Sequence, residues 1–167
     1  MSYLFCDWKI NSGNIKGQLV LLGFRLATLG TKNKFFFWIL LPHLILYRLC
    51  VEWVLGIELP WKTQVGPGLI IYHGYALVIN DGTVIGSNCI IRHSTTIGNK
   101  KLAAHQYSKS PVIGSNVDIG SNVCIIGPIT IGDNVIIGAG SVIVKDVPKN
   151  SIVVGNPGKV IRTIDVE

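Results

Sequence analysis

Charged residues are scarce in this chain. They make up 14% of its 167 residues, whereas 49% are hydrophobic. Such a chain can bury a core, but its outer faces are too apolar to stay apart in water, so we expect self-association. Cysteine is also sparse: the four residues Cys6, Cys50, Cys89 and Cys124 include no Cys-x-x-Cys pair. This spacing predicts reduced, space-filling thiols in a cytosolic protein.

Acidic residues are few as well, nine against fifteen Lys and Arg, and the net charge is +6. Most of the excess lies in residues 1–62. No basic run is interleaved with aromatic residues, so the charge does not predict nucleic-acid binding. The glycine-rich turns do not open a helix, which argues against a Walker or dinucleotide-binding motif.

A six-residue period organises the second half of the chain. An isoleucine stands at every sixth position, at Ile113, Ile119, Ile125, Ile131, Ile137 and Ile143. Turn-forming residues fill positions two to four, so each hexapeptide predicts one short strand and one corner. Three hexapeptides complete one coil of a triangular prism, in which side chains one and five point inward. A period of six does not fit an α-helix.

Two interruptions break this pattern. The same phase runs through residues 65–77 and, after a slip of two residues, through residues 79–97. An insertion at residues 100–112 then separates Ile97 from Ile113 without changing the phase. It must therefore loop out of the prism, and such excursions are where repeat proteins place function.

Residues 1–57 are predicted to form a helical region. Two apolar stretches, residues 18–29 and 35–55, favour helices. We expect Pro42 to open a second helix at its first position and Gly56 to end that helix.

The second apolar stretch is a poor membrane span. Pro42, Arg48 and Glu52 interrupt it, and its uncharged part is shorter than the roughly 20 residues that a bilayer needs. We expect its helices to pack within an oligomer, with docking at a membrane interface as the alternative. The protein is therefore expected to be cytoplasmic, with peripheral contact at the inner face of the membrane through its basic N-terminal helices.

From residue 56 the chain resembles the hexapeptide-repeat acyltransferases, within them the serine acetyltransferases and the polysaccharide O-acetyltransferases of the colanic acid type. The resemblance covers residues 56–164 and is carried by the segments GIELPWKTQVGPGLIIYHGYALVI, HSTTIGN and IGAGSVIVKDVPKNSIVVGNPGKVIR. It implies a mainly β protein, with a left-handed parallel β-helix at residues 58–164, a short N-terminal helical region and a C-terminal extension. It also implies an acetyl-CoA-dependent enzyme without a metal, and a homotrimer with active sites between neighbouring prisms.

The resemblance implies a catalytic pair. In the serine acetyltransferases the catalytic histidine follows a Gly-x-Gly corner by five residues, which places it at His73, and the orienting carboxylate fifteen residues earlier is Glu58. An imidazole can remove the proton of an acceptor hydroxyl, and a carboxylate on its other nitrogen fixes the tautomer. By the same resemblance, backbone N–H groups at Gly98 and Asn99 would hold the oxyanion. Alternatively, His73 only caps a corner.

Two other histidines compete with His73. His93 lies twenty residues later, one coil of eighteen plus the slip, so both should stack at one corner. It lines the acceptor site or is an exposed turn residue. His105 lies in the insertion, where the related galactoside and xenobiotic acetyltransferases carry their base.

The acceptor site departs from that of the serine acetyltransferases. The positions that grip serine in that family are occupied here by Tyr72, Lys109 and Ser110, so the aspartate that pairs with the ammonium is missing. Tyr72 offers an aromatic face that suits a sugar ring. We therefore expect a sugar or surface-polysaccharide acceptor, free or lipid-linked, with serine as the alternative.

Coenzyme A binding is also implied by resemblance. The matching positions are Gly120, Gly138, Ala139 and Gly140 for the pantetheine arm, and Lys145, Lys159 and Arg162 for the phosphates. Two other classes fit less well. The gaps between His73, His93 and His105 do not match the zinc-binding histidines of gamma-type carbonic anhydrases. A non-catalytic β-helix scaffold is disfavoured only by the pair His73 and Glu58.

Overall fold

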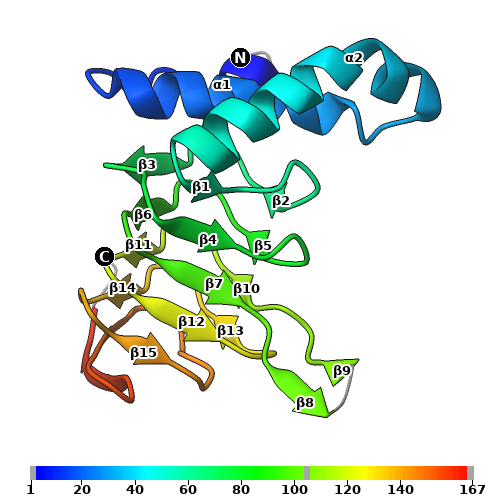
Figure 1. The fold of residues 1–167 in the computed structure, drawn as a ribbon. Helices are drawn as coiled ribbons and strands as arrows, with labels where there is room; N and C mark the ends of the chain where they lie inside the picture. The colour runs from blue at the N-terminus through cyan, green and yellow to red at the C-terminus, as the bar shows by residue number, and fades with distance from the viewer. Residues whose placement is uncertain (1–2, 104–105, 165–167) are drawn as a thin grey trace.

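A prism of short parallel strands carries a helical region across one end (Figure 1). The computed structural model describes residues 3–103 and 106–164. The mainly β prism expected from the six-residue period is confirmed, and so is the left-handed parallel β-helix implied by the resemblance.

Three parallel sheets form the walls of the prism. The first contains β1 (Ile57–Glu58), β4 (Leu77–Ile79), β7 (Thr96–Gly98), β12 (Cys124–Ile126) and β15 (Val142–Ile143). The second contains β2 (Gln64–Val65), β5 (Val84–Ile85), β10 (Val112–Ile113) and β13 (Thr130–Ile131). The third contains β3 (Ile70–Tyr72), β6 (Ile90–Arg92), β11 (Asp118–Ile119), β14 (Ile136–Ile137) and β16 (Ser151–Val154). The chain visits the three walls in turn, one hexapeptide to a wall.

The repeated isoleucines form the core. All six from Ile113 to Ile143 are 0–2% exposed. Cys89, predicted at an inward fifth position, is 0% exposed, and burial raises the pKa of its thiol. Each isoleucine stacks in register on its counterpart one coil away, as Ile97 does on Ile125 and Ile125 on Ile143. The period of six therefore becomes a continuous apolar column.

Asparagines shape the corners. Asn88, Asn116, Asn122, Asn134 and Asn150 all have φ between 56° and 58°. Asparagine tolerates this left-handed conformation better than most residues that carry a Cβ. Three of the four at one corner also form a ladder, in which the Asn116 amide donates to Asn134 (3.1 Å) and the Asn134 amide donates to Asn150 (2.8 Å).

The N-terminal region contains η1 (Tyr3–Phe5), α1 (Ile15–Leu29), α2 (Lys34–Tyr47) and a π-helical segment, η2 (Arg48–Val54). The expectation that Pro42 starts a new helix is wrong, because α2 runs through it. A proline removes only one backbone hydrogen bond, and the buried Leu44 and Tyr47 hold the following turn in place. Gly56, with φ of 64°, follows the helix end as predicted.

The helix Lys34–Val54 is the candidate membrane span among the described residues. It has 21 residues, and an 18-residue window within it has a mean hydropathy of 1.6, so it is long and apolar enough to cross a bilayer. Length and composition alone do not distinguish a span from a core helix or a signal sequence.

The helical region seals one end of the prism with polar side chains. Arg25 donates to the carbonyl oxygens of Val65 (2.7 Å) and Gly66 (2.6 Å), and Asn14 donates to that of Ile71 (2.8 Å). These are carbonyls at the open edge of the first coil, which has no coil below it. The carboxylate of Asp7 pairs with Arg25 at 2.7 Å, and both side chains are buried.

At the opposite end the chain covers one of the three walls. β17 (Lys159–Thr163) folds back antiparallel on β16. The expected C-terminal extension thus covers the last strand of the third wall.

The insertion leaves the prism as predicted. It forms a hairpin of β8 (Lys101–Ala103) and β9 (Gln106–Tyr107) that projects from the wall (Figure 1). Ser110 fastens its base, since its hydroxyl donates to the Asn80 side chain at 2.7 Å.

Candidate active site

The two extra residues of the slip widen one corner of the prism. His73 is the first residue of that corner. Tyr72 pairs with Arg92 and Val78 pairs with Thr96. Residues 73–77 therefore span a turn that residues 93–95 span in the next coil. His73 adopts φ of 53°, a left-handed conformation that costs a residue with a Cβ on the order of 1–3 kcal/mol.

The ring of His73 lies against the ring of His93. Their centroids are 6.1 Å apart, edge to face, so the predicted stacking of the two histidines at one corner is confirmed. His93 in turn stacks on Tyr75 at 5.2 Å. The Nδ1 atom of His93 is buried without a hydrogen-bond partner in the described part of the chain. His73 itself is exposed and lines a cavity of about 370 Å³ with Ser12, Gly13, Asn14 and Tyr72.

The aromatic face of Tyr72 is supported by Arg92. The Arg92 guanidinium carbon lies 5.9 Å from the Tyr72 ring centroid, and Arg92 forms an ion pair with Asp118. The phenol thus stands beside His73, where an acceptor approaching the imidazole would meet it.

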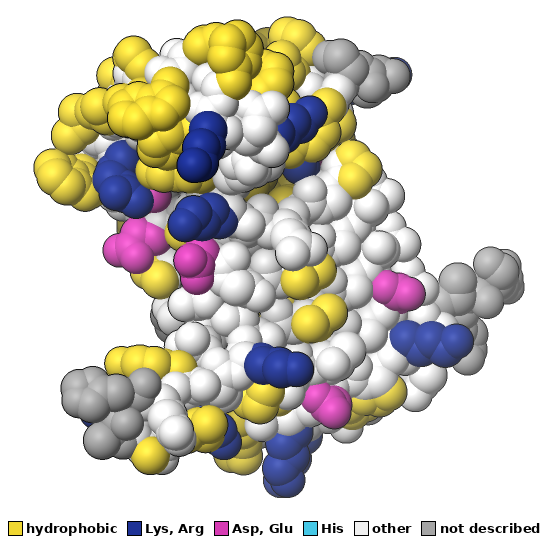
Figure 2. Space-filling view, turned by 90° about the vertical axis from the view of Figure 1, so that its right-hand side faces the viewer, with side chains coloured by type: hydrophobic (Ala, Val, Ile, Leu, Met, Phe, Trp, Pro, Cys, Tyr) yellow, Lys and Arg dark blue, Asp and Glu magenta, His cyan; other side chains and the backbone are white. Residues whose placement is uncertain are grey.

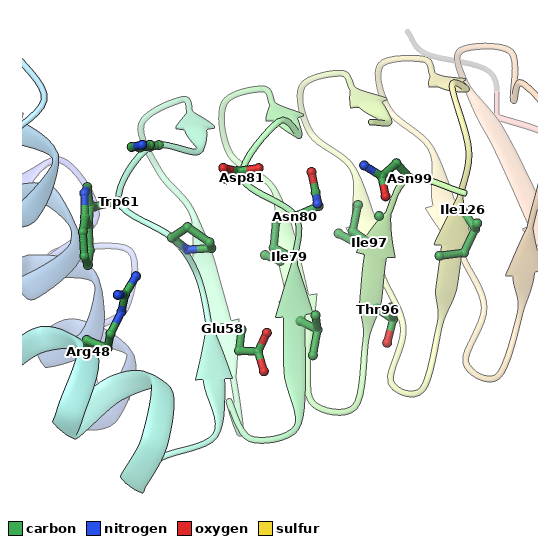
Figure 3. A pocket seen from close by; sticks show the side chains of 14 residues that line it. Arg48, Glu58, Trp61, Ile79, Asn80, Asp81, Thr96, Ile97, Asn99 and Ile126 are labelled. Carbon is green, nitrogen blue, oxygen red and sulfur yellow. The ribbon is translucent and has the colours of Figure 1, made fainter. Parts of the chain in front are cut away.

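A second cavity, here called the polar pocket, lies along the first wall and has a volume of about 470 Å³. It runs from Trp61 and Arg48 beside the helices to Asn99 and Ile126 (Figure 3). Glu58 lines it together with Gly98 and Asn99, so the structure brings the predicted carboxylate and the predicted oxyanion residues together. Asn80 and Asp81 lie one coil below Gly98 and Asn99, because Ile79 pairs with Ile97. Because one coil has eighteen residues, counting back from Gly98 and Asn99 could have predicted Asn80 and Asp81 as pocket residues. No repeat relates Arg48 or Trp61 to the pocket, so the sequence could not have predicted them.

Among the described residues, Glu58 and His73 line two different cavities. Glu58 pairs in register with Val78, the residue that ends the widened corner, and its side chain lines the polar pocket. Among the side-chain hydrogen bonds of the described residues, none joins Glu58 to His73. The dyad therefore stays a prediction.

The predicted pantetheine residues occupy the same column of corners as His73 and His93. Gly120 follows β11, and Ala139 lies against it one coil later, where a Cβ on Gly120 would stand 2.8 Å from the Ala139 Cα. The N–H groups of Gly120, Gly138 and Gly140 already donate to carbonyls of neighbouring coils. Within the described ranges, Ala139 is the member of this set whose N–H has no such partner. Of the four predicted pantetheine-binding residues, Ala139 is therefore the one whose backbone N–H is available to a ligand.

The predicted cations are spread over the surface. Lys109 lies at the base of the hairpin, Lys145 follows β15, and Lys159 and Arg162 stand on β17; all four are exposed. His105 lies outside the described residues. Among residues 3–103 and 106–164, no group of three or more His, Cys, Asp or Glu side chains could hold a metal ion.

Comparison with known proteins identifies the repeat. The model of the bacterial transferase hexapeptide (six repeats) matches residues 110–145, and that of the hexapeptide repeat of succinyl-transferase matches residues 76–100. The putative colanic acid biosynthesis acetyltransferase WcaB of Escherichia coli K12 is 38% identical over 158 residues, which cover 92% of this chain and 96% of that protein.

Serine acetyltransferases are also similar. That of Helicobacter pylori is 34% identical over 145 residues, covering 87% of this chain and 81% of that protein. The crystal structure of the Brucella abortus serine acetyltransferase in complex with coenzyme A covers 99% of this chain and 68% of that chain, with a TM-score of 0.79 and 24% identity, a likeness of fold. The chain therefore belongs to the hexapeptide-repeat acetyltransferases and is an acyltransferase.

Proposed function

We propose that the protein transfers an acetyl group from acetyl-CoA to a hydroxyl of a sugar or surface-polysaccharide acceptor, with His73 as general base. The observation that carries the proposal is the exposed imidazole of His73, held in a left-handed conformation beside Tyr72 at the widened corner. The similarity to an acetyltransferase named for colanic acid biosynthesis supports a polysaccharide acceptor.

The proposed reaction is a direct acyl transfer with general-base catalysis. The His73 imidazole takes the proton of the acceptor hydroxyl while the oxygen attacks the thioester carbon. Backbone N–H groups near Gly98 and Asn99 stabilise the tetrahedral oxyanion. When that intermediate collapses, the thiolate of coenzyme A leaves and takes the proton from the imidazolium. Catalytic hydrogen bonds often tighten only once substrate is bound, so Glu58 remains the proposed partner of His73.

Coenzyme A is proposed to lie along the corner column. Ala139 would bind the pantetheine arm through its N–H. Gly120, Gly138 and Gly140 have no side chains, so the arm could lie close to the backbone there. Lys145, Lys159 and Arg162 would bind the phosphates as charge-assisted donors.

The acceptor is proposed to be a sugar because of Tyr72. An aromatic ring presents a flat apolar face to a sugar, whereas an amino acid needs a carboxylate for its ammonium group. Lys109 and His93 are proposed to contact the acceptor. Serine is the second candidate, favoured by the 34% identity to a serine acetyltransferase.

A thiol-release assay tests donor and acceptor together. With acetyl-CoA as donor and a panel of L-serine, simple sugars and lipid-linked oligosaccharides, we expect turnover with a carbohydrate and little with serine. The variant Tyr72→Asp should not restore serine acetylation, because Lys109 and Ser110 also differ from the serine-binding pattern. Efficient acetylation of serine by the wild type would replace the sugar proposal, and no thiol release with any acceptor would favour a scaffold.

The protein is further proposed to act as a homotrimer at the inner face of the membrane. A homotrimer would bury the flat apolar faces of the prisms in pairs. It would work in the cytoplasm, with the helical end resting on the inner face of the membrane.

A further inference from the structure

The polar pocket continues into an apolar groove on the helical region. The groove has a volume of about 320 Å³ and is lined by Phe37, Leu41, Leu44, Ile45, Leu49 and Trp53 from α2 and η2. Arg48 and Trp61 line both cavities and form the junction between them. Figure 3 shows these two side chains at the end of the polar pocket that faces the helices.

The groove is open and its walls are exposed. Ile45 is 54% exposed, and Phe37, Leu49 and Trp53 are also exposed. Figure 2 shows hydrophobic side chains gathered over the helical end of the molecule, with Lys and Arg side chains along their margin. A contiguous apolar patch beside a polar pocket indicates a ligand or partner with an apolar part.

The junction carries an unused pair of donors. The Nε of Arg48 donates to Glu52 at 3.1 Å, and its guanidinium lies 4.9 Å above the Trp61 ring. Its Nη1 and Nη2 atoms have no hydrogen-bond partner among the described residues. A guanidinium held over an aromatic ring, with two amino groups that have no partner among the described residues, can donate to the oxygens of a phosphate.

These features have one order in space: polar pocket, cationic junction, apolar groove. We propose that the acceptor is a lipid-linked saccharide whose phosphate binds Arg48 and whose hydrocarbon chain lies in the apolar groove. Its sugar would occupy the polar pocket, which ends at Asn99 beside the base of the hairpin, the side that is expected to face His73 of a neighbouring subunit. This rests on the proposed acetyl transfer to a sugar and names the form of the acceptor. A second copy of this chain would cover the groove as well, but its apolar surface would leave the Arg48 fork without a partner.

Direct binding tests the groove apart from catalysis. Dodecyl phosphate, below its critical micelle concentration, and methyl phosphate carry the same kind of head group with and without a chain. In calorimetric titrations, Ile45→Glu should weaken dodecyl phosphate binding at least about tenfold, because it places a charge against the chain. Leu46→Glu is the matched control: Leu46 is the next residue, is 57% exposed and does not line the groove. The affinity of Leu46→Glu for dodecyl phosphate should stay within about twofold of the wild-type value.

The head-group contact has its own variant. Arg48→Gln should weaken dodecyl phosphate binding about tenfold through loss of a charge-assisted contact. Equal losses in Ile45→Glu and Leu46→Glu, or no binding of dodecyl phosphate, would overturn the proposal. Sedimentation is measured on the same proteins: if Ile45→Glu only breaks up a larger assembly and binding is unchanged, the groove is a contact between copies.

Transfer assays separate this inference from the proposed function. Each sugar of the panel is offered as its methyl glycoside and as its dodecyl phosphate ester. Faster acetylation of the dodecyl form is expected. Equal rates would refute the lipid-linked acceptor and leave the sugar acetyltransferase intact. Groove-dependent binding of dodecyl phosphate without acetylation of any sugar would support the chain site and remove the proposed function.

Discussion

At His73 the chain adopts a backbone conformation that favours glycine, and it does so at the corner widened by two residues. A histidine there is not needed for the turn, since asparagine serves the regular corners. Strain of this kind persists where surrounding structure imposes it, and it often accompanies function. Here the packing of His73 on His93 fixes the imidazole at the mouth of a cavity.

The first prediction concerns this residue. His73→Ala should lower turnover by about a hundredfold or more, as expected for loss of a general base, while acetyl-CoA binding and the oligomer are retained. Glu58→Gln should cost less and act on turnover, because it orients the base without exchanging a proton with substrate. His93→Ala, at the same corner one coil later, should mainly raise the KM for the acceptor. Steady-state kinetics and acetyl-CoA titration check all three; near-normal turnover in His73→Ala would transfer the role to His105.

At the scale of elements, the asparagine ladder ties successive corners together. Asn134 accepts from Asn116, donates to Asn150 and has φ of 57°. We predict that Asn134→Ala lowers the free energy of unfolding by about 1–3 kcal/mol, from loss of the hydrogen bonds and from strain. Asn134→Gly removes the same hydrogen bonds but accepts the left-handed backbone, so it should lose less. Urea unfolding of the pair measures the difference, and equal losses would exclude backbone strain as a cause.

The helical cap depends on one buried ion pair. Asp7 accepts from Arg25 and also from the backbone N–H groups of Gly68 (2.8 Å) and Leu69 (3.0 Å). Burial opposes the charge of Arg25, but the hydrogen bonds and charge of Asp7 outweigh it and raise the pKa of Arg25.

We predict that Asp7→Ala destabilises the protein by about 3–5 kcal/mol, because it leaves Arg25 buried and unpaired. Asp81→Ala, at an exposed position, is the control and should change stability by less than about 0.5 kcal/mol. Thermal unfolding checks both. If the two variants unfold alike, the ion pair does not secure the cap.

At the scale of the whole molecule, the sequence predicted the features that periodicity determines. The period of six located the three walls, the buried isoleucines and the excursion of the hairpin, because each coil repeats the same local rules. It could not locate the groove, since the groove is lined by α2 and η2, and where Arg48 meets Trp61 depends on how these helices cross the end of the prism. It also missed the continuity of α2 through Pro42, where packing outweighs local preference. The catalytic pairing of Glu58 with His73 was implied by the resemblance to the serine acetyltransferases, and a matching position in the sequence does not determine side-chain contact.

The shared active site is testable by mixing subunits. If His73 of one subunit faces the hairpin of its neighbour, His73→Ala and a variant lacking residues 101–107 should each be inactive. Trimers assembled from both after joint refolding should recover about a quarter of wild-type activity, because one interface in four combines an intact histidine with an intact hairpin. Absence of recovery in mixed trimers, with sedimentation confirming that they form, would place each site within one subunit.

The helical cap at one end and β17 at the other lie outside the internal coils, whose number can vary. Every internal coil is bonded to its neighbours through the same register, so a duplicated stretch of eighteen residues would fit between two existing coils and lengthen the wall by about 4.8 Å. Such an insertion would leave the helical cap and the pairing of β17 with β16 unchanged. The height of the wall that a long ligand could contact would therefore change with the number of coils, while the corner of His73 near the cap would stay in place.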